Sequence, residues 1–329
     1  MVAPKQGILS VRINPAVKFL ARILGPELLH GAWLRLLKSF PLELEPPRGL
    51  EVETRMGKLR SPIGLAAGYD KSGKYVGALS KLGFGYVVVG SFTLKPRKGH
   101  PKPRLAYRDA EQAVVNAMGL PNPGVREFVK SFKGVTGCKV VASITGDTLE
   151  EFVECFATVQ DVVDAVEVNV SCPTHEASIR MRRPETVREL AEGLRGIKSK
   201  PAYIKIPPPL TPEEMDDVCR LVKAWVDCGM DGVTALNTLP VDAPELALGR
   251  GGLSGRPLRP IMLRTVRRIR EELGEGVEIN AVGGIMTGRD AADALKAGAN
   301  TVQIMTAMLF RGPRAPILIA KELISDKVW

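Results

Sequence analysis

A cysteine follows an apolar segment near the middle of the chain, where residues 166–176 read VEVNVSCPTHE. Two interpretations of Cys172 are open: a small buried side chain, or a proton acceptor in a polar loop, since a thiol has an ordinary pKa of about 8.5. His175 could activate this thiol, but one histidine without an identified carboxylate to orient its ring is thin evidence, so a solvated loop side chain is the favoured interpretation. With only three histidines, the chain predicts neither a histidine-based metal site nor a Ser-His-Asp triad.

Eight apolar, β-branched runs lack the alternation of half-exposed strands, which indicates strands covered on both faces. They lie at residues 62–66, 86–90, 139–144, 165–170, 202–206, 231–236, 278–282 and 301–305. Helix start signals lie between them: Pro184 opens one predicted helix, Thr211 caps another that runs to about Cys228, and Gly288 opens a third. This alternation over 329 residues predicts an α/β protein, a (β/α)8 or TIM barrel.

The active site of such a barrel lies at the C-terminal ends of its strands, and the residues there are polar, glycine-rich and chemically varied. They are residues 66–71, 90–91, Ser143, Asn169, 171–174, Lys205, 237–238, 283–284 and 305–306. Gly283, Gly284 and Thr306 stand where barrels commonly bind phosphate, and the glycine-rich segment 251–255 adds a predicted loop. Together these residues favour a phosphorylated ligand.

Two lysines at different strand ends supply positive charge for an anionic ligand or intermediate. Lys71 follows the first run, and Lys205 interrupts the apolar segment 202–209. An unpaired ammonium buried in such a segment would be costly, so a role for Lys205 is favoured over a merely solvated side chain.

The first 45 residues predict two helices, because Pro15 suits a first helical turn and Gly25-Pro26 breaks the segment. The second helix has a broad apolar face, formed by Leu28, Leu29, Trp33, Leu36 and Leu37. Either both helices pack on the barrel, or residues 14–40 form a small cap that contacts a membrane interface. Residues 50–60 then predict a hairpin that closes the N-terminal, non-catalytic end of the barrel.

The amino-acid composition of the chain argues against several classes of function. The net charge of +10 is spread along the chain and aromatic residues make up only 5%, which argues against binding to nucleic acid. The five cysteines are scattered without a CxxC spacing, so neither a disulfide framework nor a zinc site is predicted and a reducing compartment fits best. With no signal-peptide pattern and no apolar run of spanning length, we expect a cytoplasmic protein.

From about residue 47 to the C-terminus the chain resembles the dihydroorotate dehydrogenases, flavoproteins of pyrimidine biosynthesis. The matching segments are GLAAGYDKSG (64–73), KLGFGYVVVGSFTLKPRKGHPKPR (81–104), NAMGLPNPGV (116–125), VNVSCP (168–173), DGVTALNT (231–238), GGLSGRPL (251–258), VGGI (282–285) and VQIMTAMLF (302–310). The resemblance implies an FMN-dependent enzyme that oxidises dihydroorotate to orotate, with residues 1–45 as an N-terminal helical extension and residues 46–329 as the FMN-binding barrel.

The resemblance also implies a role for each matching residue. Cys172 would take the C5 proton of dihydroorotate while hydride leaves C6 for the flavin, and Lys205 would steady the negative charge of the reduced ring. The FMN phosphate would lie near Gly255, Gly283, Gly284, Met305 and Thr306. The rest of FMN would contact Ala67, Gly68, Lys71, Ser91, Ser143, Asn169, Lys205 and Leu236. The substrate would contact Lys71, Asn116, Met118, Gly119, Leu120, Asn169, Thr174, Asn237 and Thr238.

Two departures from the family pattern leave alternatives open. Thr174 stands where the family usually has asparagine, so a related dihydropyrimidine is an alternative substrate. The cysteine base resembles the soluble class, which reduces fumarate or, through a partner subunit, NAD. The segments AAGYDK and GGLSGRPL and the N-terminal extension resemble the membrane-associated class, which reduces quinone. We give the extension more weight, because a lipid quinone requires a cap over the flavin, and expect a quinone acceptor with peripheral contact on the inner face of the cell membrane.

Outside the family, a flavin-free phosphate-binding barrel that uses Lys205 as a Schiff-base lysine is the alternative enzyme. A non-catalytic binding scaffold is the alternative outside catalysis, although nothing in the sequence favours it. A homodimer is left open.

Overall fold

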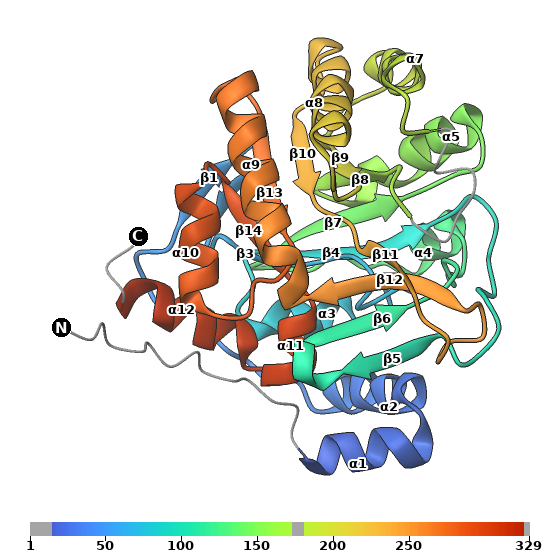
Figure 1. The fold of residues 1–329 in the computed structure, drawn as a ribbon, viewed down its shortest axis with the longest axis vertical. Helices are drawn as coiled ribbons and strands as arrows, with labels where there is room; N and C mark the ends of the chain where they lie inside the picture. The colour runs from blue at the N-terminus through green and yellow to red at the C-terminus, as the bar shows by residue number, and fades with distance from the viewer. Residues whose placement is uncertain (1–14, 173–180, 326–329) are drawn as a thin grey trace.

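The computed structural model describes residues 15–172 and 181–325, and its centre is a closed barrel of parallel strands (Figure 1). Around the barrel the strands are β3 (Ile63–Leu65), β4 (Tyr86–Phe92), β7 (Lys139–Ile144), β8 (Ala165–Asn169), β9 (Ala202–Ile206), β10 (Gly232–Ala235), β13 (Glu278–Val282) and β14 (Thr301–Ile304), and β14 pairs with β3. Each strand coincides with one of the eight predicted runs. The predicted (β/α)8 barrel is confirmed.

Helices cover the outside of the barrel, which explains why its strands are buried on both faces (Figure 1). The longer ones are α5 (Leu149–Val159), α7 (Pro184–Arg195), α8 (Pro212–Asp227), α9 (Arg259–Leu273), α10 (Gly288–Lys296) and α12 (Ala315–Ser325). Shorter ones are α3 (Val76–Leu79), α4 (Val125–Ser131), α11 (Thr306–Arg311) and the 3-10 turns η1 (Ser80–Leu82), η2 (Asp109–Glu111), η3 (Gln160–Val162) and η4 (Arg256–Leu258). Thr211 and Glu214 form a capping box at the start of α8, as the sequence indicates.

A hairpin closes the N-terminal end of the barrel, as predicted. Its strands are β1 (Val52–Thr54) and β2 (Gly57–Leu59), and Met56 between them packs in a cluster that includes the barrel side chain Tyr203. The backbone N–H of Arg55 donates to Glu278 Oε2 at 2.6 Å. This end is therefore filled by side chains, and a ligand must enter from the opposite end.

A second, antiparallel sheet stands beside the C-terminal ends of the barrel strands, and the sequence did not predict it. Its order is β11 (Leu239–Asp242), β12 (Arg250–Gly255), β6 (Ala113–Asn116) and β5 (Leu105–Arg108). The expectation of a loop at residues 251–255 was wrong, because this segment forms most of β12. Its partner strand β6 is remote in sequence. The side chain of Asn116 in β6 donates to the carbonyl of Gly252 in β12, 136 residues further along the chain. No local pattern reveals such a pairing.

The predicted N-terminal helices are present as α1 (Pro15–Leu24) and α2 (Pro26–Ser39); α2 lies beside β5 and α1 packs on α2 (Figure 1). Leu34 and Leu37 of α2 are buried in the main core, whereas Leu28 and Leu36 are 61% and 53% exposed. The predicted apolar face therefore packs on the barrel in part and remains exposed in part. Within the described residues, no helix combines the length and apolar character needed to cross a membrane.

Candidate functional site

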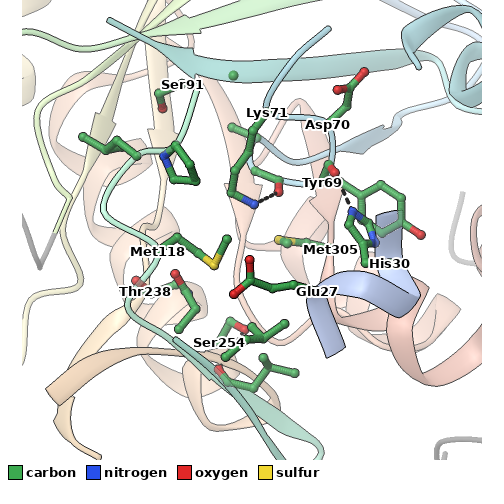
Figure 2. A pocket seen from close by; sticks show the side chains of 18 of the residues that line it. Glu27, His30, Tyr69, Asp70, Lys71, Ser91, Met118, Thr238, Ser254 and Met305 are labelled. Atoms are coloured by element: carbon green, nitrogen blue, oxygen red, sulfur yellow. Dashed lines mark hydrogen bonds between the residues drawn. The ribbon is translucent and has the colours of Figure 1, made fainter. Parts of the chain in front are cut away.

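A cavity of about 340 Å³ lies at the C-terminal ends of the barrel strands, between the barrel, the second sheet and α2 (Figure 2). A smaller recess of about 80 Å³ adjoins it and shares lining residues such as Lys205 and Thr306. The cavity and the recess together extend from α2 to the turn formed by Gly283 and Gly284.

The structure brings nearly all the predicted site residues to these two spaces. The cavity is lined by Ala67, Gly68, Lys71, Ser91, Asn116, Met118, Gly119, Leu120, Asn169, Cys172, Lys205, Asn237, Thr238, Met305 and Thr306, and the recess by Leu236, Gly255, Gly283 and Gly284. Ser143 does not line either space. It is fully buried behind Ser91, and the two hydroxyl oxygens are 2.8 Å apart. Thr174 and His175 lie outside the described residues.

Amide and hydroxyl side chains form one connected wall of the cavity. Asn169 Nδ2 donates to Ser91 Oγ at 3.0 Å, and Asn237 Nδ2 donates to Asn169 Oδ1 at 3.2 Å. Ser171 Oγ donates to Asn169 Oδ1 at 3.1 Å and accepts from Asn237 Nδ2 at 2.9 Å. These bonds connect the ends of β4, β8 and β10 and hold Ser171, which immediately precedes Cys172. The wall is thus preorganised to present fixed polar groups to a ligand.

Cys172 is buried, at 9% exposure, and it also lines the cavity. The two interpretations made from the sequence are therefore compatible. Arg182 Nη2 donates to the Ser171 carbonyl at 3.3 Å. Burial lowers the pKa of Arg182, and its interaction with Cys172 opposes that shift. A cation within electrostatic reach favours the thiolate form of a cysteine, so Arg182 is a group that sequence reasoning missed.

Lys71 projects into the cavity, where its ammonium donates to the carbonyl of Gly68 (Figure 2). Burial lowers the pKa of Lys71 to about 8, and the nearby carboxylate of Glu27 partly opposes this shift. The lysine is therefore a cation at neutral pH and loses its charge in mildly alkaline solution.

Lys205 is not an unpaired buried ammonium, because its Nζ lies 3.3 Å from Glu167 Oε1. Both side chains are buried, at 7% and 1% exposure. Sequence reasoning named the lysine and missed its partner. The signal was present, since a glutamate inside the apolar run 165–170 faces the same burial cost as the lysine.

Two glycines at the recess allow neighbouring segments of the main chain to pack closely against them. Gly255 and Gly284 have φ values of +102° and +75°, and a Cβ would lie 2.3 Å from the Gln112 carbonyl oxygen at the first position and 2.6 Å from the Arg259 nitrogen at the second. Side chains are excluded at both, so the recess keeps a main-chain surface suited to an anion such as phosphate.

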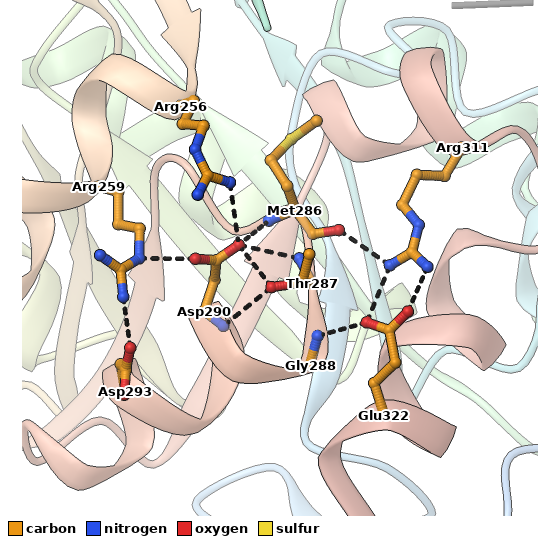
Figure 3. A network of polar contacts seen from close by, with 9 residues as sticks. All are labelled: Arg256, Arg259, Met286, Thr287, Gly288, Asp290, Asp293, Arg311 and Glu322. Carbon is orange, nitrogen blue, oxygen red and sulfur yellow. Dashed lines mark hydrogen bonds and ion pairs between the residues drawn. The ribbon is translucent and has the colours of Figure 1, made fainter. Parts of the chain in front are cut away.

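A network of ion pairs and hydrogen bonds anchors the turn that follows Gly284 at the edge of the recess (Figure 3). Asp290 Oδ1 lies 2.6 Å from Arg259 Nε, and Asp290 Oδ2 accepts from the N–H groups of Met286 and Thr287 at 3.1 and 3.0 Å. Arg311, which ends α11, pairs with Glu322 and donates to the carbonyl of Met286 at 3.0 Å. The turn that follows the two glycines is therefore anchored to α9, α10, α11 and α12.

α2 supplies one wall of the cavity with residues that the sequence analysis did not single out. Glu27 accepts two hydrogen bonds from Arg104, each 2.9 Å long, and projects into the cavity (Figure 2). Burial acts to raise the pKa of Glu27, but the hydrogen bonds and charge of Arg104 outweigh it and the pKa is lowered. His30 Nε2 is 2.8 Å from the Tyr69 carbonyl oxygen, and burial lowers the pKa of this imidazole. α2 therefore contributes to the lining of the cavity.

A closed barrel that gathers such groups at the C-terminal ends of its strands defines the chain as a (β/α)8-barrel enzyme. The family model for dihydroorotate dehydrogenase matches residues 49–326. The chain therefore belongs to the dihydroorotate dehydrogenase family, the FMN-dependent oxidoreductases of pyrimidine biosynthesis.

Individual relatives agree with this assignment. The chain is 33% identical over 297 residues to a protein of Chromobacterium violaceum named dihydroorotate dehydrogenase (quinone), covering 83% of this chain and 85% of that one. A protein of the same name from Azotobacter vinelandii is 35% identical over 317 residues, covering 88% and 90%. The crystal structure of DHODH from Eimeria tenella in complex with ferulenol is similar with a TM-score of 0.83 and 27% identity, covering 94% of each chain.

Proposed function

We propose that this chain binds FMN, oxidises dihydroorotate to orotate and passes the electrons to a quinone. The observation that carries the proposal is that Cys172, Lys71 and Lys205 line one cavity next to a recess bounded by glycines. A proton acceptor, two cations and a site for the FMN phosphate are what the protein must supply to remove a proton and a hydride from a substrate that carries a carboxylate.

The two adjoining spaces fit the parts of FMN. We place the phosphate in the recess, because the closely packed backbone at Gly255, Gly283 and Gly284 leaves main-chain groups to face it. Met305, Thr306 and Leu236 line the same recess, and Ala67, Gly68, Ser91 and Asn169 line the adjoining cavity where the flavin would lie. Ser143 would act by holding Ser91. When bound, FMN would accept the hydride from the substrate.

The remaining groups of the cavity would hold dihydroorotate. Lys71 would pair with its carboxylate. The ring would form hydrogen bonds with the amides of Asn116, Asn169 and Asn237 and with the hydroxyl of Thr238. Residues 118–120 would enclose the ring. Cys172 would take the C5 proton, and Arg182 would favour the thiolate needed for this step. Thr174 is proposed as a further substrate contact on the family pattern alone.

A quinone is the proposed acceptor because α2 forms a wall of the cavity and carries an exposed apolar surface. Of the twelve exposed large hydrophobic side chains among the described residues, seven lie on or next to α1 and α2. They are Phe19, Leu20, Ile23, Leu24, Leu28, Leu36 and Phe40. We propose that residues 1–45 form an extension that meets the inner membrane surface through residues 14–40, where an apolar acceptor is dissolved, and that residues 46–329 form the flavin-binding barrel.

The proposal is tested by reducing the purified protein with dihydroorotate in the absence of oxygen. We expect the flavin absorbance to bleach and to return when menaquinone is added, but not with fumarate or NAD. Reoxidation by fumarate or NAD alone would replace the quinone assignment with a soluble-class acceptor. Bleaching by another dihydropyrimidine in preference to dihydroorotate would replace the substrate.

The affinity for orotate should fall as pH rises above 8. Lys71 is protonated below its lowered pKa of about 8, where it can pair with the orotate carboxylate, and neutral above it. We expect the dissociation constant, measured from the change in flavin absorbance on titration with orotate, to rise by up to about tenfold per pH unit above 8. Lys71→Met should bind weakly at every pH and without this dependence. A flat profile for the wild type between pH 7 and 10 would contradict the assignment.

A further inference from the structure

The interior of the barrel directly below the cavity is polar. Lys205 lines the cavity, and its register partners on the neighbouring strands are Asn169 on β8 and Thr234 on β10. Side chains alternate along a strand, so Glu167, two residues before Asn169, points to the same interior. A buried carboxylate therefore stands one layer below the groups that face the proposed flavin.

Glu167 and Lys205 depend on each other. The separation of 3.3 Å between Glu167 Oε1 and Lys205 Nζ is the one hydrogen bond that either side chain makes among the described residues. Glu167 Oε2 has no hydrogen-bond partner in that part of the chain, and neither have the side-chain oxygens Thr234 Oγ1 and Gln303 Oε1. A buried charge is costly without a partner, so the lysine compensates the carboxylate and the carboxylate neutralises the lysine.

A second buried glutamate shows what a structural carboxylate in this barrel looks like. Glu278, 6% exposed at the closed end, accepts from the Tyr203 hydroxyl at 2.8 Å and from the backbone N–H of Arg55 at 2.6 Å, and so anchors the hairpin. Glu167 has no such role, because its hydrogen bond among the described residues reaches only Lys205 on the adjacent strand β9 and holds no turn. Its contact with the active-site lysine is what distinguishes it.

We propose that Glu167 is a positioning residue that sets how much of the Lys205 positive charge acts on the bound flavin, and thereby how readily that flavin is reduced. The inference rests on the proposed binding of FMN. Reduced flavin carries negative charge, so an unpaired Lys205 would stabilise it strongly. With Glu167 in place the pair is neutral overall. Lys205 then stabilises the reduced flavin less, and the acceptor reoxidises it more readily.

The test replaces the carboxylate by an amide of the same shape, Glu167→Gln, and measures the equilibrium between bound flavin and a reference redox dye in an anaerobic titration. We expect this equilibrium to shift towards reduced flavin by about tenfold or more. Lys205→Met should shift it the other way, and adding Glu167→Gln to Lys205→Met should change nothing further. Glu278→Gln is the matched control: it removes another buried carboxylate, 6% exposed where Glu167 is 1% exposed, and it should lower the melting temperature without moving the equilibrium.

An unchanged equilibrium in flavin-loaded Glu167→Gln would overturn the proposal, and so would the same shift in the Lys205→Met background. If Glu167→Gln does not retain flavin, Glu167→Asp lengthens the pair and should shift the equilibrium in the same direction by a smaller factor; no shift would be equally decisive. Loss of flavin from both variants, with retention in Lys205→Met, would mean that the carboxylate only builds the site. Absence of flavin from the wild type would instead refute the proposed function itself.

Discussion

Replacing Cys172 by alanine is expected to slow the reduction of bound flavin by dihydroorotate by a factor of about 10²–10⁴, the usual contribution of a positioned proton acceptor. The thiol lines the cavity, follows a wall of fixed amides, and lies within electrostatic reach of Arg182. Stopped-flow measurement of flavin bleaching without oxygen isolates this step from the later reaction with the acceptor. The absorbance spectrum of the bound flavin should be unaltered, because the substitution removes no proposed FMN contact.

Two further variants make the assignment of Cys172 specific. Cys172→Ser should retain activity only at higher pH, because a hydroxyl gives up its proton less readily than a thiol; a rate equal to the wild type at every pH would show that the thiol is not the base. Cys138→Ala is the matched control. This cysteine is 8% exposed at the opposite end of the barrel, where burial raises the pKa of its thiol to about 12. Its loss should leave the rate unchanged.

The second large effect is expected at the exposed apolar surface of the N-terminal helices. Replacing Phe19, Ile23, Leu28 and Phe40 by serine should lower turnover with a long-tailed quinone in lipid vesicles by at least about tenfold, since each large apolar side chain placed in lipid contributes about 1.5–3 kcal/mol. These four side chains are 61–74% exposed, so the fold loses little packing. Turnover with ferricyanide, which needs no membrane, should stay at the wild-type rate.

The control for this surface uses exposed apolar side chains elsewhere on the barrel. Leu210, Leu318 and Ile324 are 56%, 37% and 38% exposed, and their replacement by serine should leave both turnover rates unchanged. An equal loss with quinone and ferricyanide in the helix variant would show that α1 and α2 only support the fold. Unchanged turnover in vesicles would show that this surface does not meet the membrane. Sedimentation with vesicles would report binding independently of turnover.

The barrel and most of its site were predictable because the signals are local. Each covered strand is a short apolar run, and in a closed parallel barrel all strands end at the same rim. A residue directly after a run, such as Asn169 or Asn237, therefore falls at the site whatever the details of packing. The glycine turn at Gly283 and Gly284 was predictable for the same reason.

The sheet of β5, β6, β11 and β12 was not predictable from local patterns. Its strands are short, β12 is rich in glycine, and the pairing of β12 with β6 joins distant parts of the chain. The sequence predicted that Ser143 lies at a strand end, but not that it lies behind Ser91. The position of its side chain relative to Ser91 depends on how β4 and β7 pair.

The amino-acid sequence by itself determined the eight strands, the helices between them and the chemical groups at the rim, since these follow from composition over a few residues. Only the tertiary structure decided which charges meet: Glu27 with Arg104 across 77 residues, and Lys205 with Glu167 across 38. The physical reason is that burial cost and pairing depend on the closure of the barrel and the docking of α2. No single segment of the chain contains that information.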